Sequence, residues 1–190
     1  MLLTSKSFAE GGRALVYLCA QLGDKVKLEK DDAARKEADD LMALLTPIAK
    51  AFVTEAGLEA VNHGVQIYGG HGFIREWGME QNVRDARIST LYEGTTGIQA
   101  LDLLGRKVLL SSRGKCVREF SKKLVDFGTK NLRDPKLRPF AWKLLKIAAE
   151  WNYLTTRIML VAAKDRDMVS TASYDFLMYS GYAMMAYFWA

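Results

Sequence analysis

Apolar residues recur every three or four positions along most of the chain, which is the spacing that places them on one face of an α-helix. The pattern predicts a first helix over residues 1–23, ended by a turn at Gly23. Residues 24–40 are mostly charged, with both signs mixed. They are expected to form a solvent-facing connection that leads into a helix near Asp31 or Asp32.

A long helix is then predicted to start at Thr46 and Pro47. Threonine is a favourable N-cap, and proline is tolerated at the first helical position because its missing N–H would have no partner there. The apolar stripe expected on this helix consists of Ala49, Phe52, Val53, Ala56, Ala60 and Ile67.

Nine of the fifteen glycines lie between Gly57 and Gly105, and they concentrate in two clusters, at 68–73 and 92–97. Glycine is favoured where the backbone needs a positive φ or a close approach, so irregular backbone is expected at both clusters. Residues 79–91 between them are predicted to form a short helix. Thr95 or Thr96 can cap the next helix, whose expected apolar stripe is Ile98, Leu101, Leu104 and Val108.

The last third of the chain is predicted to form three more helices, over residues 115–130, 139–165 and 170–190, with a turn at 131–138. No stretch shows the alternation typical of β-strands, so the sequence predicts an all-α fold. The side chains expected in the core of the final helix are Met178, Tyr182, Met184, Met185 and Trp189.

Composition narrows the class of protein. Hydrophobic residues make up 49% of the 190 residues and charged residues 26%, which excludes intrinsic disorder. The net charge of +5 does not imply a nucleic-acid partner, and none is expected; the charge is −4 over residues 51–105 and +9 over 106–190. The most apolar stretch, residues 176–190, is shorter than the roughly 20 residues needed to span a bilayer, so no membrane span is predicted.

Cysteine and histidine usage indicates neither a disulfide framework nor a metal site. Cys19 and Cys116 lie far apart, His63 has no ligand partner four residues later, and His71 lies in a glycine loop. No metal is therefore expected, and a reducing cytoplasm is the expected compartment.

Two motifs could carry chemistry. The glycines at 69, 70 and 72 follow a predicted helix rather than a strand, so they match neither a dinucleotide fingerprint nor a P-loop. Glu93 lies between an aromatic residue and a Gly-Thr turn. From the residues alone, two interpretations stay open: a carboxylate presented to a cavity, or an acidic residue favoured by the dipole of the following helix.

Four ordered segments together resemble the C-terminal helical domain of the flavin-dependent acyl-CoA dehydrogenases: residues 49–52, 66–73, 84–87 and 91–99. Each segment alone is a weak signal, but the ordered set is specific. This resemblance covers residues 1–112. From Gly114 onward the chain is similar to the extra C-terminal domain of a subgroup described as acetyl-CoA-dehydrogenase-like.

The resemblance implies an up-and-down four-helix bundle over residues 1–112, followed by a smaller helical domain over 113–190. Complete members of the family carry an N-terminal helical domain and a β domain upstream. We therefore expect a fragment that starts inside the first domain and stops inside the second. Because the β domain helps to position the cofactor, the fragment alone is expected to be inactive.

The resemblance also implies a chemistry. Glu93 occupies the position of the family's catalytic base, which removes the α-proton of an acyl-CoA thioester while the β-hydrogen leaves as hydride to FAD. The backbone N–H of Glu93 would donate to the thioester oxygen, and Tyr92 and Gly94 would line the substrate end. A carboxylate is a weak base for such a carbon, so the site must polarise the carbonyl and exclude water.

Cofactor contacts follow from the same resemblance. Gln66, Gly69 and Gly70 match the segment that approaches the FAD of the neighbouring subunit. The segment that contacts the FAD phosphates of its own subunit matches Thr95, Thr96 and Gly97. Two residues depart from the family pattern: Gly97 stands where many members have glutamine, and Gln81 stands where lysine or arginine is usual.

The implied partners are an acyl-CoA of fatty acid metabolism, an electron-transfer flavoprotein or similar acceptor, and further copies of the chain in a homodimer or tetramer. Two alternatives stay open. An acyl-CoA oxidase would share Glu93 but pass electrons to oxygen, and a non-catalytic helical oligomerisation module would not use Glu93 at all.

Overall fold

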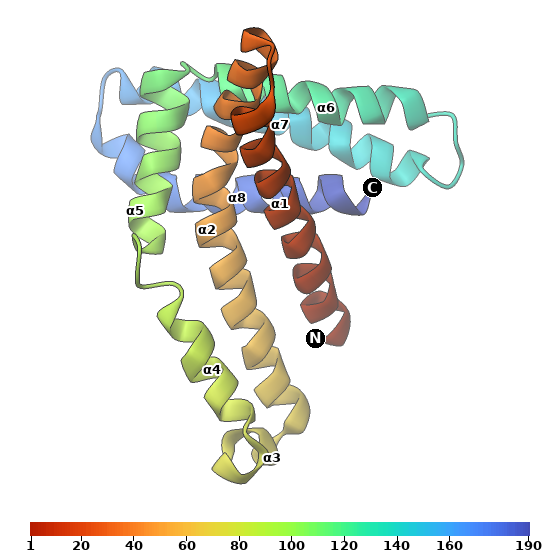
Figure 1. Ribbon diagram of the computed structural model, residues 1–190, viewed down its shortest axis with the longest axis vertical. Coiled ribbons are helices and arrows are strands. Elements are labelled where there is room, and N and C mark those ends of the chain that lie inside the picture. Colours follow the sequence, from red (N-terminus) through yellow and green to blue (C-terminus); the bar gives the residue numbers. More distant parts are fainter.

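The computed structural model describes residues 1–190, and every regular element in it is a helix, which confirms the predicted all-α class (Figure 1). Two of the elements depart from α-helical winding: η1 is a 3₁₀-helix and η2 is a π-helix. The elements are α1 (Leu2–Leu28), α2 (Asp32–Tyr68), α3 (Gly70–Phe73), η1 (Arg75–Trp77), α4 (Met79–Ile88), α5 (Thr96–Leu101), η2 (Asp102–Ser111), α6 (Lys115–Asn131), α7 (Arg138–Ala162) and α8 (Asp167–Trp189).

The turn between α1 and α2 is much shorter than the sequence predicts. Helix α1 continues through Gly23 and ends at Leu28; the backbone N–H of the C-cap residue Glu29 donates to Lys25 O at 2.9 Å. The expected connection over 24–40 is therefore wrong, because only Glu29–Asp31 separate the two helices. A glycine inside a helix costs only about 1 kcal/mol, which the burial of α1 against α2 offsets.

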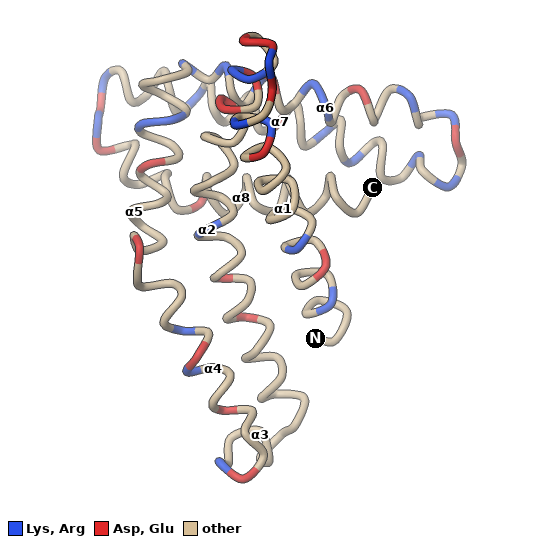
Figure 2. The backbone as a smooth tube through the Cα atoms, in the orientation of Figure 1, with Lys and Arg blue, Asp and Glu red and all other residues tan.

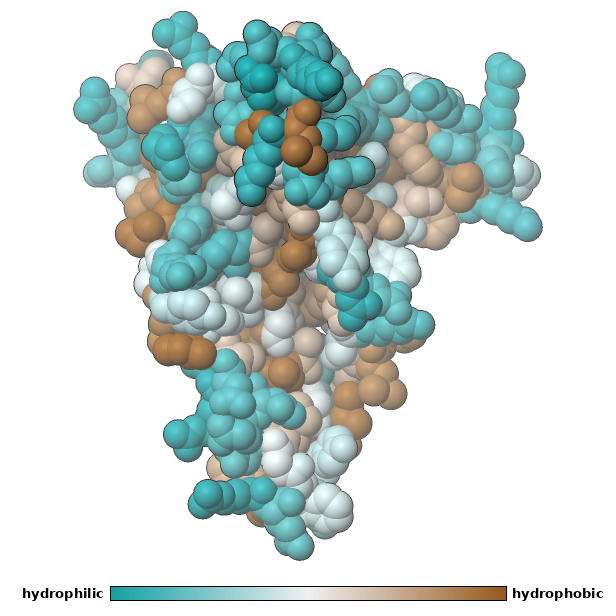
Figure 3. Space-filling model, viewed as in Figure 1, coloured by the Kyte–Doolittle hydropathy of each residue, from teal (hydrophilic) through white to brown (hydrophobic).

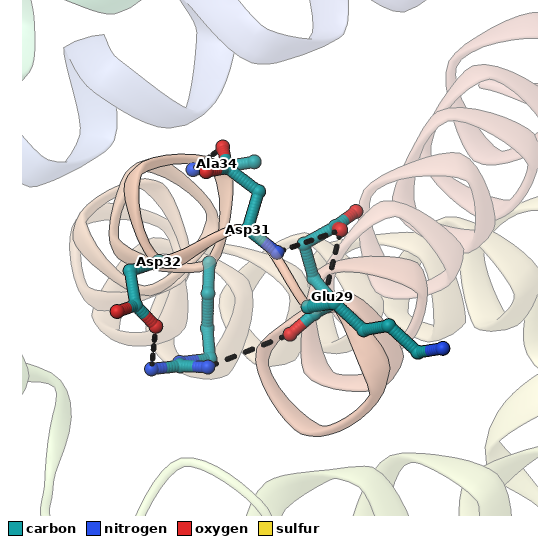
Figure 4. Close-up of polar contacts among 6 residues, drawn as sticks. Glu29, Asp31, Asp32 and Ala34 are labelled. Carbon is teal, nitrogen blue, oxygen red and sulfur yellow. Dashed lines mark hydrogen bonds and ion pairs between the residues drawn. The ribbon is translucent and has the colours of Figure 1, made fainter.

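Side-chain hydrogen bonds fix this turn (Figure 4). The Asp31 carboxylate accepts from the backbone N–H of Ala34 at 2.9 Å, which confirms the predicted helix start in this region. The Glu29 carboxylate accepts from the N–H of Asp31 at 3.2 Å. The charged side chains predicted to form a loop thus serve as caps and as exposed surface of two helix ends.

The predicted helix start at Thr46 and Pro47 is wrong, because both residues lie inside α2. The Thr46 hydroxyl donates to Met42 O at 2.7 Å. Leu44, Leu45 and Ile48 are fully buried around the proline, and their burial offsets the cost of its missing N–H. The packing of α2 in the core therefore outweighs the helix-start signal of Thr46 and Pro47.

Helix α2 is also long and apolar enough to cross a membrane by length and composition. Core helices of proteins that span no membrane meet the same criterion, and the inner face of α2 is packed in the core.

The winding of the helix that follows α4 changes partway along. After α5, η2 makes wider turns in which an N–H donates to the carbonyl five residues earlier, as Ser112 N does to Lys107 O at 3.2 Å. The wider winding rotates the side chains relative to an α-helix. The expected stripe is only half right: Leu104 and Val108 are buried, whereas Ile98 and Leu101, which lie in α5 before the wider turns begin, are exposed.

One core joins both halves of the chain. Helices α6 and α7 form an antiparallel hairpin that projects from the bundle, and α8 runs back across α1 and α2 (Figure 1). A cluster of 25 buried residues draws on all of the long helices. Gly181 of α8 lies so close to Phe52 of α2 that an added Cβ would be 2.1 Å from the ring. The predicted division at residue 112 is not tested by this packing and stays a prediction.

The core expected in α8 is partly wrong. Met184 and Met185 are buried, but Tyr182 is 49% exposed and Trp189 is 45% exposed. Tyr182 packs its ring edge-on against Phe52, with 5.0 Å between centroids. Trp189 donates from Nε1 to Ser7 O of α1 at 3.3 Å, so both aromatic residues cover the edge of the core instead of filling it.

Candidate catalytic loop and cofactor segments

The segment between α4 and α5, residues 89–95, carries the candidate base. Glu93 has a φ of 54°, and Gly94 has a φ of 90°. A non-glycine residue in the left-handed region costs about 1–3 kcal/mol and persists only where the surroundings hold it. The predicted irregular backbone is confirmed for residues 92–95, whereas Thr96 and Gly97 already belong to α5.

The first part of this loop is anchored by hydrogen bonds to the end of α4. The Thr90 side chain is buried; it accepts from the Arg87 guanidinium at 2.6 Å and donates to Arg87 O at 3.0 Å. The N–H groups of Leu91 and Tyr92 donate to Ile88 O at 3.0 and 3.4 Å. Local hydrogen bonds therefore order the backbone of the loop up to Tyr92.

Beyond Tyr92 these local bonds stop. The N–H groups of Glu93, Gly94 and Thr95 make no hydrogen bond within the chain. Glu93 is exposed, and its own N–H is without a partner in the chain. The arrangement can accept a proton and donate a hydrogen bond from a single residue.

Side chains of α2 and α5 hold the second part of the loop. The Lys50 ammonium donates to Gly94 O at 2.6 Å and to Ser89 O at 3.1 Å. The Gln99 amide donates to Glu93 O at 3.2 Å. Lys50 was not singled out from the sequence, although a lone lysine within the apolar run of residues 41–53 was a signal that could have identified it.

The start of α5 differs in detail from the prediction. Thr95 occupies the N-cap position, but its hydroxyl makes no capping hydrogen bond. The buried Thr96 donates instead to the Glu55 carboxylate of α2 at 2.5 Å. A Cβ added to Gly97 would meet nothing within 4 Å. The first turn of α5 therefore offers free N–H groups, a free hydroxyl and bare backbone.

The second glycine cluster lies at the opposite end of α4 from Glu93 (Figure 1). Gly69 ends α2 with a φ of 60°, and its N–H donates to Gln66 O at 3.1 Å. A Cβ added at Gly69 or Gly70 would meet nothing within 4 Å, so this backbone is open to an approaching group. The ten residues of α4 correspond to a rise of roughly 15 Å.

The structure therefore separates the predicted site residues into two groups. Tyr92, Glu93, Gly94, Thr95, Thr96 and Gly97 lie together in the loop and at the start of α5. Gln66, Gly69 and Gly70 lie at the tip formed by α2 and α3. Within one chain the second group is not brought to Glu93.

Exposed apolar side chains lie beside the catalytic loop. Figure 2 shows charged residues at the α1–α2 turn and at the far end of the α6–α7 hairpin, and also along α4. The space-filling view in Figure 3 shows hydrophobic atoms exposed along the flank formed by α4 and α5. The exposed apolar residues on this flank are Ile88, Leu91, Tyr92, Ile98 and Leu101.

The structure contains no metal-binding cluster, and its cysteines are not activated. No group of three or more His, Cys, Asp or Glu side chains is arranged to hold a metal ion. Both cysteines are free, and burial raises the pKa of the Cys19 and Cys116 thiols, which keeps them in their less reactive neutral form.

Comparison with known protein families gives two matches that together cover nearly the whole chain. Residues 4–109 match the model described as "Acyl-CoA dehydrogenase, C-terminal domain", and residues 116–190 match "Acetyl-CoA dehydrogenase C-terminal like". The chain belongs to the acyl-CoA dehydrogenase family. Its resemblance to that family, first seen in four short segments, is thereby confirmed.

Similar members of the acyl-CoA dehydrogenase family are considerably longer than this chain. The 3-methylmercaptopropionyl-CoA dehydrogenase of Ruegeria pomeroyi is 37% identical over 182 residues, which are 95% of this chain and 31% of the relative. The broad-specificity linear acyl-CoA dehydrogenase FadE5 of Mycobacterium tuberculosis is 32% identical over 168 residues, which are 86% of this chain and 27% of the relative. The chain thus spans less than a third of either relative.

Two further matches bear on partners and on fold. A subunit named for the caffeyl-CoA reductase-Etf complex, CarC of Acetobacterium woodii, is 36% identical over 96 residues, covering 50% of this chain and 22% of the relative. The solved structure titled "Bd2924 apo-form" matches with a TM-score of 0.68 at 19% identity, over 97% of this chain and 32% of that one. This likeness supports the fold alone.

Proposed function

We propose that this chain supplies the catalytic base of a flavoenzyme that oxidises acyl-CoA thioesters to 2,3-enoyl-CoA, with Glu93 removing the α-proton. The observation that carries the proposal is the state of Glu93 itself. Glu93 is exposed, its N–H has no partner within the chain, and it holds a left-handed φ of 54° three residues before α5 begins.

The N–H and the carboxylate of Glu93 act on two neighbouring groups of the thioester, its carbonyl and its α-carbon. A hydrogen bond from the N–H of Glu93 to the carbonyl oxygen stabilises the negative charge that develops there as the α-proton leaves. The carboxylate accepts that proton. The apolar flank around the loop excludes water once it is covered, which strengthens both interactions.

The residues present fit FAD at two places. The free N–H groups and hydroxyl at the start of α5, beside the open backbone of Gly97, are suited to phosphate oxygens. Thr95, Thr96 and Gly97 would therefore hold the phosphates of the chain's own FAD. When bound, FAD accepts the β-hydrogen of the substrate as a hydride.

The tip of α2 and α3 would serve the FAD of a second copy of the chain. Its bare backbone at Gly69 and Gly70 allows a close approach, and the length of α4 separates it from Glu93 of the same chain. We therefore propose a homodimer or tetramer in which Gln66, Gly69 and Gly70 reach across to the neighbour's cofactor. An electron-transfer flavoprotein is the proposed acceptor, which the name of the Acetobacterium woodii relative supports.

The proposal is tested by replacing Glu93 with glutamine in the protein at its full natural length. A general base contributes about 10²–10⁴-fold to rate, so Glu93→Gln is expected to lower kcat/KM by that factor. The assay follows a panel of acyl-CoA thioesters with a dye acceptor, and bound flavin is measured from its absorbance. Glu37→Gln, the same change at an exposed site on α2, is the matched control and keeps full activity.

Retained activity in Glu93→Gln would contradict the assignment of the base. Absence of dehydrogenation in the parent protein with every thioester would favour the helical oligomerisation module. Peroxide production in place of dye reduction would identify an oxidase.

A further inference from the structure

The loop that carries Glu93 is held from outside by one lysine. Lys50 extends from the middle of α2, is only partly exposed, and donates from Nζ to two carbonyls, Gly94 O at 2.6 Å and Ser89 O at 3.1 Å. These two acceptors stand on either side of Glu93. The ammonium also lies 6.0 Å from the centroid of the Tyr92 ring, so it closes the loop across its base.

The loop needs such a support, because nothing local supplies it. Backbone hydrogen bonds end at Tyr92, and the next three N–H groups have no partner within the chain. Glu93 nevertheless keeps a φ of 54°, which most side chains avoid. The other hydrogen bonds to this part of the backbone both come from Gln99: its side-chain amide donates to Glu93 O at 3.2 Å, and its backbone N–H donates to Thr95 O at 3.0 Å.

The value of φ matters for the proposed chemistry in a direct way. φ is the rotation about the N–Cα bond, so it sets where the side chain points relative to the N–H of the same residue. If Glu93 relaxed to a common negative φ, its carboxylate and its N–H could no longer meet the α-proton and the carbonyl oxygen of one thioester together. Misplacement by about 1 Å can cost 10²-fold in rate.

We propose that Lys50 is a positioning residue that holds the backbone of Glu93 in its left-handed conformation by binding the carbonyls on both sides of it. The proposal rests on the proposed function of Glu93. Lys50 acts on the loop, because both its hydrogen bonds go to backbone oxygens. A charged donor is suited to this task, since hydrogen bonds from an ammonium are about twice as strong as neutral ones.

The test compares three variants of the full-length protein. Lys50→Met keeps the length of the side chain and removes both hydrogen bonds, and it is expected to lower kcat about 10- to 100-fold while KM changes less than about threefold. The primary isotope effect with α-deuterated substrate is expected to rise, because proton removal becomes the slow step. Lys50→Arg retains donors for both carbonyls and is expected to recover most of kcat.

Lys36→Met is the matched control. It makes the same substitution on the same helix, at a lysine that is exposed and pairs only with Asp40 at 3.5 Å, and it is expected to leave kcat unchanged. A second readout is the coupling between Lys50→Met and Gln99→Leu. Because both side chains bind neighbouring carbonyls, the fall in kcat of the double variant is expected to be smaller than the product of the two single falls. Bound flavin and circular dichroism confirm that each variant is folded.

Three outcomes would overturn the proposal. They are an unchanged kcat in Lys50→Met, a change in KM without a fall in kcat, or a fall in kcat that Lys50→Arg fails to recover. If Lys50→Met does not fold, Lys50→Gln takes its place, with the same expected fall in kcat and small change in KM. Failure of the proposed function gives a different result, since Glu93→Gln would then stay active. An inactive Glu93→Gln beside a fully active Lys50→Met rejects only the role of Lys50.

Discussion

Two polar side-chain atoms in the core, Ser121 Oγ of α6 and Trp151 Nε1 of α7, are buried without a hydrogen-bond partner. A buried polar group that loses its water and gains no partner costs about 1–3 kcal/mol. Ser180 of α8 is buried just as deeply, but its hydroxyl donates to Phe176 O at 2.7 Å. The two serines therefore form a natural pair for measuring this cost.

We expect Ser121→Ala to raise the free energy of unfolding by about 1 kcal/mol, because it removes an unsatisfied hydroxyl. Ser180→Ala is expected to lower it by about 0.5–1.5 kcal/mol, because it removes a satisfied one. Both changes gain the same helix propensity, so the difference between them isolates the hydrogen bond. Urea unfolding of both variants is the measurement, and equal effects would contradict the assignment of Ser121 Oγ as unsatisfied.

Single residues also show what a sequence reveals about a site. Glu93, Gly94 and Gly97 could be identified because their chemistry is tied to a local motif. Lys50 and Glu55 act on that motif from α2, about 40 positions earlier in the chain. The lone lysine in an apolar run marks Lys50 as unusual, but only the packing of α2 against the loop shows which residues it and Glu55 bind.

Among the elements, the turn from α2 into α3 depends on a close backbone contact. A Cβ added to Gly72 would lie 2.4 Å from Val65 O and 2.9 Å from Val65 Cα, both of which are backbone atoms that cannot move aside. Gly70, two residues earlier, has nothing within 4 Å. The bare backbone at Gly72 is thus a packing requirement, while that at Gly70 leaves space for an external group.

Gly72→Ala is therefore expected to destabilise the tip by about 2–3 kcal/mol, at the upper end of ordinary single substitutions. Gly70→Ala is expected to change the free energy of unfolding by less than about 0.5 kcal/mol, since it meets no neighbour and needs no positive φ. Hydrogen exchange over residues 65–73 reports the local loss directly. Similar protection in both variants would show that the contact with Val65 is not tight.

Element boundaries were the least predictable part of the fold. The helices of the last third were predicted to within three residues; the bounds beside Gly114 and the turn containing Pro135 are right to within one, whereas the turn between α7 and α8 lies three residues earlier than predicted. Gly23 and Pro47 are equally strong local signals, yet both lie inside helices. The difference is tertiary: α1 and α2 pack along each other, and the buried residues on either side of each breaker outweigh its cost.

At the scale of the whole molecule, α8 ties the two halves together. It belongs to the part of the chain that matches the second family model, yet it packs against α1, α2 and α5 of the first. Gly181 makes this possible by letting α8 approach the Phe52 ring. Because the core is continuous, the chain is expected to lose its structure in one cooperative step.

We expect Gly181→Ala to lower the midpoint of thermal unfolding by several degrees, because the new methyl group would overlap the Phe52 ring. Gly57→Ala on α2 meets nothing within 4 Å and is expected to raise stability by up to about 1 kcal/mol through helix propensity. Calorimetry of both variants tests the shared core. Two separate transitions, with only the later residues affected by Gly181→Ala, would contradict it.

The left-handed conformation of Glu93 has a consequence for how this position evolves. Glycine or asparagine would adopt that backbone at lower cost, so a drift away from glutamate at this position is favoured by folding and opposed only by catalysis. A lineage that no longer needed the reaction would lose this carboxylate early and keep the rest of the chain intact. A relative that has lost the activity is therefore expected to fold normally but to lack glutamate at this position.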